Sequence, residues 1–176
     1  MAAPASARAL ASLLLALLAV GSARAEGPSA FAELLAGETY TDLEGESWTA
    51  EDLAGRVVLV DFWATWCTPC IAQMPKLKEL DARYDRADLV IVGVALDSLD
   101  RRRLRSFTKR HRLGWPQIHE PLGTESEIAR RFAVEAVPAT FLIDRSGRVV
   151  ARDLSAEVLA GVIETLVELG GHAAGS

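Results

Sequence analysis

The chain has only two cysteines among its 176 residues, and this scarcity excludes a disulfide scaffold. Small domains held together by disulfides need several bridges, whereas two cysteines form one bridge at most. The 7 prolines and 13 glycines are too few for a collagen-like or low-complexity chain. Half of the residues are hydrophobic, which excludes intrinsic disorder as the main state. Composition and length therefore predict one globular domain with a packed core.

The apolar run near the N-terminus is too short for a membrane anchor. It covers residues 10–20, whereas a helix that crosses a bilayer core needs about 20 residues. Arg8 precedes the run, and the small-residue ending Ala23-Arg24-Ala25 follows it, which is the layout of a signal peptide. We therefore predict a signal peptide over 1–25, cleaved after Ala25, a lead-in linker over 26–37, one domain over 38–169 and a loose tail over 170–176.

Positive charge is scarce once the predicted signal peptide is removed. Residues 26–176 hold 17 basic and 24 acidic residues, a formal net charge of −7, because Arg8 and Arg24 belong to the signal peptide. We therefore expect no nucleic-acid partner. Export places the domain in the periplasm or another oxidising compartment, where idle thiols become disulfides. Both cysteines therefore need an explanation.

The order of apolar patterns predicts an α/β fold. The predicted elements are a hairpin over 40–48 turning at Glu44-Gly45, a buried strand over 57–63, a helix from Thr68 that Pro75 kinks, a buried strand over 89–96, a helix capped by Ser98 that runs to about residue 112, a short helix opened by a capping box over 124–127, a hairpin of 139–144 with 148–153, and a helix from Ser155. The apolar residues predicted to face inward on the last helix are Val158, Leu159, Val162, Ile163, Leu166 and Leu169. This order implies a central mixed sheet, parallel in its first half, flanked by helices.

Cys67 and Cys70 lie three residues apart where a buried strand meets a helix, and redox chemistry explains them best. As a structural bridge, so tight a loop gives about 2 kcal/mol at most. At the N-terminus of the helix, backbone N–H groups and the helix dipole lower the pKa of the Cys67 thiol and stabilise its thiolate. We predict that Cys67, at the exposed helix edge, is the nucleophile and that Cys70 resolves the mixed disulfide.

Asp61 and Pro138 are further candidate site residues. Asp61 lies inside the apolar run 57–63, where burial should raise the pKa of its carboxyl, so it could accept a proton from Cys70 beneath the cysteine pair. Pro138 stands at the entrance of the strand over 139–144, where it removes a ladder donor.

Residues 58–70, which include Trp66-Cys67-Thr68-Pro69-Cys70, and residues 137–144, which begin with Val137-Pro138, resemble the thioredoxin superfamily. The resemblance is greatest to its exported TlpA/ResA-like branch (redoxin, or AhpC-TSA-like, domains) and covers about residues 38–169. It implies a thioredoxin-like fold with an N-terminal hairpin, and an added strand and helix within 113–132.

The same resemblance implies roles for the residues around the cysteines. Pro138 would be cis and lie against the pair, and the backbone of Val137 would bind an extended substrate segment. Trp66, with Thr68 and Pro69, would form the docking surface, whereas Trp63 is expected to pack in the core. Many cytochrome-maturation members of the branch have a glutamate where this chain has Gln73, so Asp61, which resembles the buried acid of thioredoxin, is expected to handle the proton.

These residues favour an exported thiol-disulfide oxidoreductase of the protein-disulfide reductase type, without a cofactor. Its partners would be disulfide-containing exported proteins and a membrane thiol-disulfide electron donor. Two alternatives stay open: oxidative disulfide donation, although the Thr68-Pro69 pair lacks the histidine typical of such oxidants, and Cu(I) binding by Cys67, Cys70 and Met74.

Structural zinc is not expected, because it needs four ligands and the three histidines have no spacing that would join them to the cysteines. These histidines are His111, His119 and His172. Seven basic residues between Arg101 and Arg112 form either a solvated helix face or a weak, salt-sensitive contact with an acidic partner or anionic lipid head groups.

Overall fold

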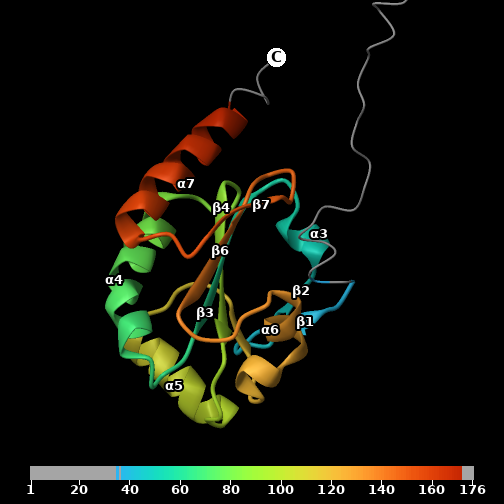
Figure 1. Cartoon of the computed structure of the whole chain (residues 1–176), viewed down its shortest axis with the longest axis vertical. Helices are drawn as coiled ribbons and strands as arrows, with labels where there is room; N and C mark the ends of the chain where they lie inside the picture. The colour runs from blue at the N-terminus through green and yellow to red at the C-terminus, as the bar shows by residue number, and fades with distance from the viewer. Residues whose placement is uncertain (1–34, 36, 172–176) are drawn as a thin grey trace, which may run out of the picture.

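The computed structural model describes residue 35 and residues 37–171 (Figure 1). The predicted signal peptide, almost all of the lead-in linker, and His172 lie outside these residues. The strands are β1 (Tyr40–Thr41), β2 (Ser47–Trp48), β3 (Val57–Trp63), β4 (Leu89–Ala95), β5 (Gln117–His119), β6 (Ala139–Ile143) and β7 (Val149–Arg152). The helices are α3 (Ala50–Leu53), α4 (Thr68–Arg83), α5 (Arg101–His111), a 3₁₀ turn over Gly123–Glu125, α6 (Glu127–Arg131) and α7 (Ala156–Gly171).

The predicted mixed sheet is confirmed. Five strands pair in the order β5-β4-β3-β6-β7, with β3 parallel to β4, β4 parallel to β5, and β6 antiparallel to both β3 and β7. β1 and β2 form the separate predicted hairpin, and Gly45 takes a positive φ of 96° in its turn. The added strand and helix predicted within 113–132 are β5 and α6.

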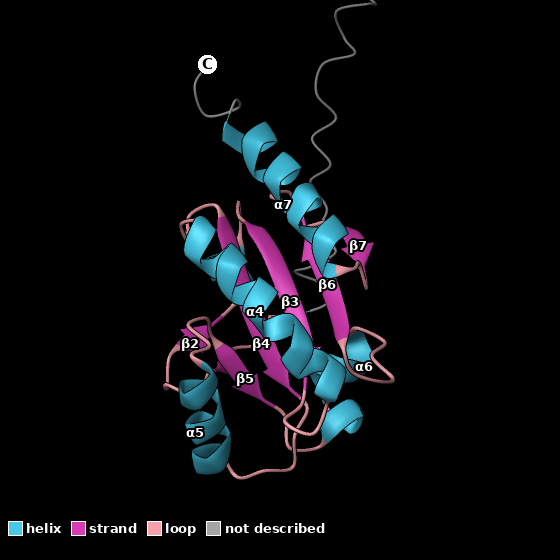
Figure 2. Cartoon of the chain, turned by 90° about the vertical axis from the view of Figure 1, so that its left-hand side faces the viewer, coloured by secondary structure: helices cyan, strands magenta, loops and turns pink. Residues whose placement is uncertain are grey.

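Helices cover both faces of the sheet, which explains why β3 and β4 are buried along their whole length. In Figure 1, α4, α5 and α7 lie on one side of the sheet, and α3 and α6 lie on the other. Figure 2 shows α4 and α7 crossing the first of these faces. Because side chains alternate along a strand, Leu59 and Trp63 face the α4 side, and Phe62 faces the α6 side against Phe132 and Phe141.

Two predicted helix caps are wrong. Asp100, not Ser98, caps α5, because its carboxylate accepts from the backbone N–H of Arg103 at 2.9 Å. The capping box predicted at Thr124 is absent, since residues 123–125 form a 3₁₀ turn and the hydroxyl of Ser126 caps α6 instead.

The last helix begins as predicted, but it buries a narrower stripe. Leu159 and Ile163 are buried against α4 and β3, whereas Val158 and Leu169 are exposed. The prediction that all six apolar residues face inward is therefore wrong for these two. α7 ends at Gly171, two residues beyond the predicted end of the domain.

Within residues 35 and 37–171, no helix is both long and apolar enough to cross a membrane.

Candidate functional site

The two cysteines form a disulfide between the end of β3 and the first turn of α4. Their Cα atoms are 5.3 Å apart. Cys67 is the N-cap of α4, and its Sγ accepts from the backbone N–H of Cys70 at 3.2 Å. Pro69 suits the first turn, where a backbone N–H has no intrahelical partner. The Cys67 sulfur therefore lies at the positive end of a 16-residue helix, where a thiolate is stabilised.

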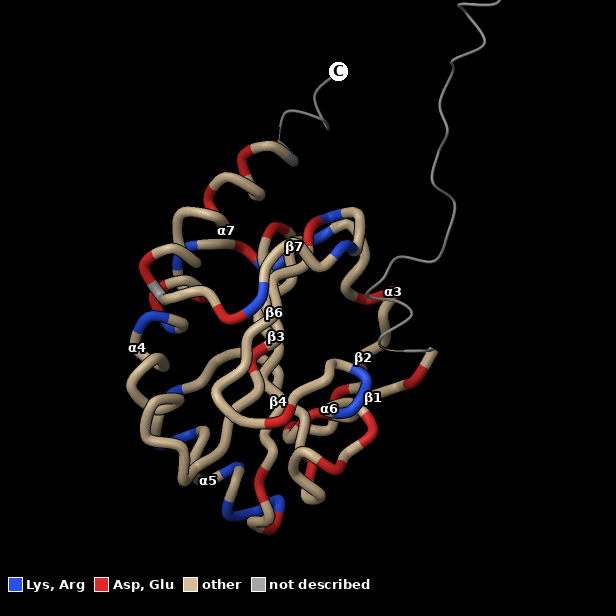
Figure 3. The backbone as a smooth tube through the Cα atoms, in the orientation of Figure 1, with Lys and Arg blue, Asp and Glu red and all other residues tan. Residues whose placement is uncertain are grey.

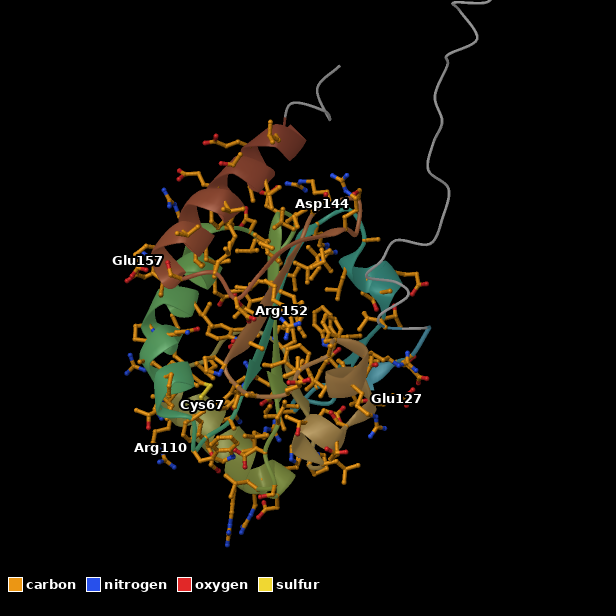
Figure 4. The ribbon with its side chains drawn as sticks, in the orientation of Figure 1. Cys67, Arg110, Glu127, Asp144, Arg152 and Glu157 are labelled. Atoms are coloured by element: carbon orange, nitrogen blue, oxygen red, sulfur yellow. A yellow bond between two sulfur atoms is a disulfide. The ribbon has the colours of Figure 1, made fainter. Side chains whose placement is uncertain are left out.

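Cys67 is buried in this disulfide state, so the expectation that it lies at an exposed edge is wrong. Only 3% of its surface is accessible, because it packs in a cluster with Trp63, Met74 and Leu104. The preceding residue, Trp66, is exposed instead, with 69% of its surface accessible. Thr68 and Pro69 are exposed as well, so an exposed rim borders the disulfide (Figure 4 labels Cys67).

Asp61 lies on the α4 side of the sheet, between the hydrophobic cluster that contains Leu59 and the cluster that contains the two cysteines. It alternates along β3 with Leu59, which packs near Leu77, and with Trp63, which packs with Cys70. Only 5% of Asp61 is accessible, and burial raises the pKa of its carboxyl to about 7. No hydrogen bond or ion pair reaches this carboxyl from the residues that the structure describes.

A second polar group lies beside Asp61 in the same row of the sheet. Asp61 is in register with Gly93 on β4, which is in register with Gln117 on β5. Because Gly93 has no side chain, the carboxamide of Gln117 occupies the space above it, and a Cβ on Gly93 would lie 2.2 Å from Oε1. That oxygen accepts from the Trp63 indole N–H at 2.9 Å. The predicted core packing of Trp63 is therefore confirmed, and a hydrogen bond fixes its ring.

The Val137–Pro138 peptide bond is cis, and the loop that contains it meets the cysteine pair. Val137 is half-buried and packs against the cluster that contains Cys67 and Cys70. A cleft of about 510 Å³ lies beside it, lined by Trp66, Leu122 and Glu135 among others. Trp66 and Val137, two of the four residues predicted to contact substrate, thus border one cleft, whereas Thr68 and Pro69 do not line it.

Asp97 is a site residue that sequence reasoning missed. It follows β4, is 98% buried, and clamps the loop before the cysteines. One carboxylate oxygen accepts from the backbone N–H and hydroxyl of Thr65, at 2.7 and 2.6 Å, and the other accepts from the backbone N–H of Leu99. The signal was an acid after a buried strand, whose C-terminal end lies beside that of the parallel strand leading to Cys67.

Among the residues that the structure describes, no group of three or more His, Cys, Asp or Glu side chains could hold a metal ion. Met74 packs in the same cluster as the two cysteines.

The fold and the site define a thioredoxin-like protein whose two cysteines, three residues apart, form a disulfide at the N-terminus of a helix. Residues 32–152 match the AhpC/TSA family, and the chain belongs to that family.

Several relatives are named as oxidoreductases. The thiol-disulfide oxidoreductase ResA of Bacillus thuringiensis subsp. konkukian is 34% identical over 110 residues, which are 62% of this chain and 61% of that protein. The chain therefore spans about three fifths of that relative. A thiol-disulfide oxidoreductase structure from Bacteroides fragilis is 30% identical, with a TM-score of 0.65 over 73% of this chain and 96% of that one. A secreted Mycobacterium tuberculosis disulfide oxidoreductase structure is 25% identical, with a TM-score of 0.64 over 76% and 98%.

Proposed function

We propose that this chain is an exported thiol-disulfide oxidoreductase that reduces disulfides on extracytoplasmic proteins. The observation that carries the proposal is the Cys67–Cys70 disulfide at the N-terminus of α4, beside an exposed Trp66. Relatives named as thiol-disulfide oxidoreductases support it.

The first step is attack by the Cys67 thiolate on a substrate disulfide. A bond forms between the Cys67 sulfur and one substrate sulfur, and the other substrate sulfur leaves as a thiolate, which takes up a proton. The helix N-terminus favours this step because it stabilises the attacking thiolate at neutral pH.

The second step is resolution by Cys70. Its thiol loses a proton and attacks the Cys67 sulfur, which releases the second substrate thiolate and forms the Cys67–Cys70 disulfide. The substrate gains two electrons and the cysteine pair loses two, so a thiol-disulfide donor in the membrane must return two electrons before the next cycle. Asp61 is the proposed proton acceptor. Burial raises the pKa of its carboxyl to about 7, so near neutral pH the carboxyl can both take up and release a proton.

The substrate segment is proposed to lie in the cleft between Trp66 and Val137. Trp66 offers a large exposed apolar face, Val137, which precedes the cis Pro138, lines the same cleft, and Thr68 and Pro69 form the exposed rim beside the disulfide. The backbone of Val137 would pair with an extended segment as a strand edge does. Export is supported by the signal-peptide layout of residues 1–25 and by the secreted relative.

The experiment that tests this order of attack uses residues 26–176 and a peptide dimer joined by one disulfide. Reduced Cys70→Ser protein should accumulate a mixed disulfide with one peptide, measured by intact mass, because the resolving thiol is missing. Cys67→Ser protein should accumulate none, while the wild type should release both peptides and become oxidised. Accumulation on Cys67→Ser instead would assign the attack to Cys70, and no peptide release by the wild type would contradict the proposed activity.

A further inference from the structure

The basic residues of α5 fall into separate groups in the structure. Arg101 donates to the backbone carbonyl of Asp42, and Arg105 pairs with Glu44. Both interactions join α5 to the N-terminal hairpin, so these two arginines stabilise the fold.

Arg102 and Arg110 have no such structural role. Both side chains are exposed, and neither forms a hydrogen bond or ion pair with any residue that the structure describes. They lie with Arg103, which pairs with Asp100 at 3.3 Å, along one face of the helix. Figure 3 shows the basic residues of α5 at the end of the molecule opposite the outer end of α7.

These three arginines border a hollow of about 440 Å³ beside the cysteine loop. Its other walls include Thr65, two residues before Cys67, and the ring of Phe107. Figure 4 shows Arg110 and Cys67 at the same end of the molecule.

The hollow is held in a fixed position relative to the disulfide. Phe107 stacks on Trp63 with ring centroids 5.5 Å apart, and Leu104 is fully buried in the cluster that contains both cysteines. On the opposite wall, Thr65 is clamped by the carboxylate of Asp97. A group bound in the hollow would therefore lie at a defined place beside the reacting sulfurs.

We propose that this hollow binds an acidic segment of the protein whose disulfide is reduced, with Arg102 and Arg110 pairing with its carboxylates. The inference rests on the proposed function and adds to it a substrate class. Residues 26–176 carry a formal charge of −7, so an acidic partner is repelled by most of the surface and attracted here. That contrast orients the partner with its disulfide toward Cys67. A concave site between a helix and a loop suits a chain segment better than a flat lipid surface.

The test uses two peptide dimers, each joined by one disulfide, with three glutamates or three glutamines on each side of the cysteine. Reduced wild type, Arg102→Gln/Arg110→Gln, and Arg56→Gln/Arg83→Gln are compared at low and high ionic strength. The last variant removes the same charge at the other ends of β3 and α4, because Arg56 precedes β3 and Arg83, which pairs with Glu164 at the surface, is the last residue of α4. Net charge is therefore matched. The readout is the second-order rate constant of peptide release.

The Arg102→Gln/Arg110→Gln protein should reduce the glutamate peptide about three- to tenfold more slowly than the other two proteins at low ionic strength. The glutamine peptide should react at one rate with all three, and high salt should remove the difference. Equal slowing of both double variants would assign the effect to net charge and overturn the inference. The inference would also be overturned if only Arg102→Gln/Arg110→Gln lost binding to vesicles of anionic lipid while its peptide rates stayed unchanged.

A second measurement separates this inference from the proposed function. A glutamate peptide without cysteine is titrated into the oxidised proteins, and backbone amide chemical shifts are followed. Weaker binding in Arg102→Gln/Arg110→Gln alone supports the docking site even if no protein reduces either peptide, an outcome that would contradict the proposed function. Equal binding by all three proteins overturns the docking site.

Discussion

The carboxyl of Asp61 is buried without a hydrogen bond or ion pair from the residues that the structure describes. Because burial raises the pKa of its carboxyl to about 7, the folded chain holds a proton that the unfolded chain releases above pH of about 4. The free energy of unfolding should therefore fall between pH of about 4 and 7 through this group. Above pH 7 the carboxyl is ionised in the folded chain too, and the cost of burying its charge lowers the free energy of unfolding by up to about 4 kcal/mol.

Asp61→Asn removes this titration and the proposed proton acceptor together. We predict that the variant is more stable than the wild type by about 2–4 kcal/mol at pH about 8, and little changed at pH about 4. We also predict that the mixed disulfide decays about ten- to a hundredfold more slowly, because Cys70 has lost its base. Urea unfolding at several pH values and stopped-flow kinetics measure the two effects. An equal stability change at every pH would show that Asp61 does not titrate in this range.

Asp97 is predicted to position the loop that carries the cysteines. Asp97→Asn keeps the shape of the side chain but replaces one acceptor oxygen by an NH₂ donor. That donor must face either the two donors of Thr65 or the backbone N–H of Leu99, so stability should fall by about 1–3 kcal/mol. The loop is then released, and peptide reduction should slow with an altered pH profile of Cys67 alkylation. Asp144→Asn is the matched control, since Asp144 clamps residues 146 and 148 at the other end of the molecule (Figure 4). An equal loss of reduction rate in both variants would indicate a general effect of stability.

At the scale of elements, helix starts were the least predictable feature. Ser98 lies close enough before the basic run to cap a helix there. The Asp97 carboxylate instead accepts from the backbone N–H of Leu99, and α5 begins only at Arg101. The short helix α3 was missed altogether, although Thr49 and Asp52 form its capping box. Both cases turn on which of two nearby polar side chains reaches a backbone N–H, and sequence spacing alone does not decide that.

Asp61, Gly93 and Gln117 are in register across the neighbouring strands β3, β4 and β5. Gly93→Ala would place a Cβ where the Gln117 carboxamide lies, so that carboxamide must move and Trp63 loses its acceptor. We predict a loss of about 1–3 kcal/mol in the free energy of unfolding. The cost should be smaller in a Gln117→Ala background, because the clash and the hydrogen bond are already absent there. Additive costs in chemical denaturation would contradict this coupling.

For the whole molecule, local patterns predicted the mixed sheet, because β3 and β4 are buried on both faces and each hairpin has its own turn residues. The cysteine pair, Asp61 and the cis Val137–Pro138 bond were likewise expected from motif and resemblance. The burial of Cys67 and the approach of Gln117 to Gly93 were not predicted. Both depend on contacts between segments far apart in the chain, and no local pattern encodes them.

The Cys67–Cys70 pair is proposed to work in the reductive direction. The measurement that tests it most directly is the reduction potential of the Cys67–Cys70 couple in residues 26–176, equilibrated in glutathione or dithiothreitol buffers after chelator treatment. A reductase that receives electrons from a membrane donor should have a potential near about −250 mV. A potential near about −120 mV would rule out this direction, because the oxidised pair would then donate its disulfide to thiols rather than be re-reduced for the next cycle.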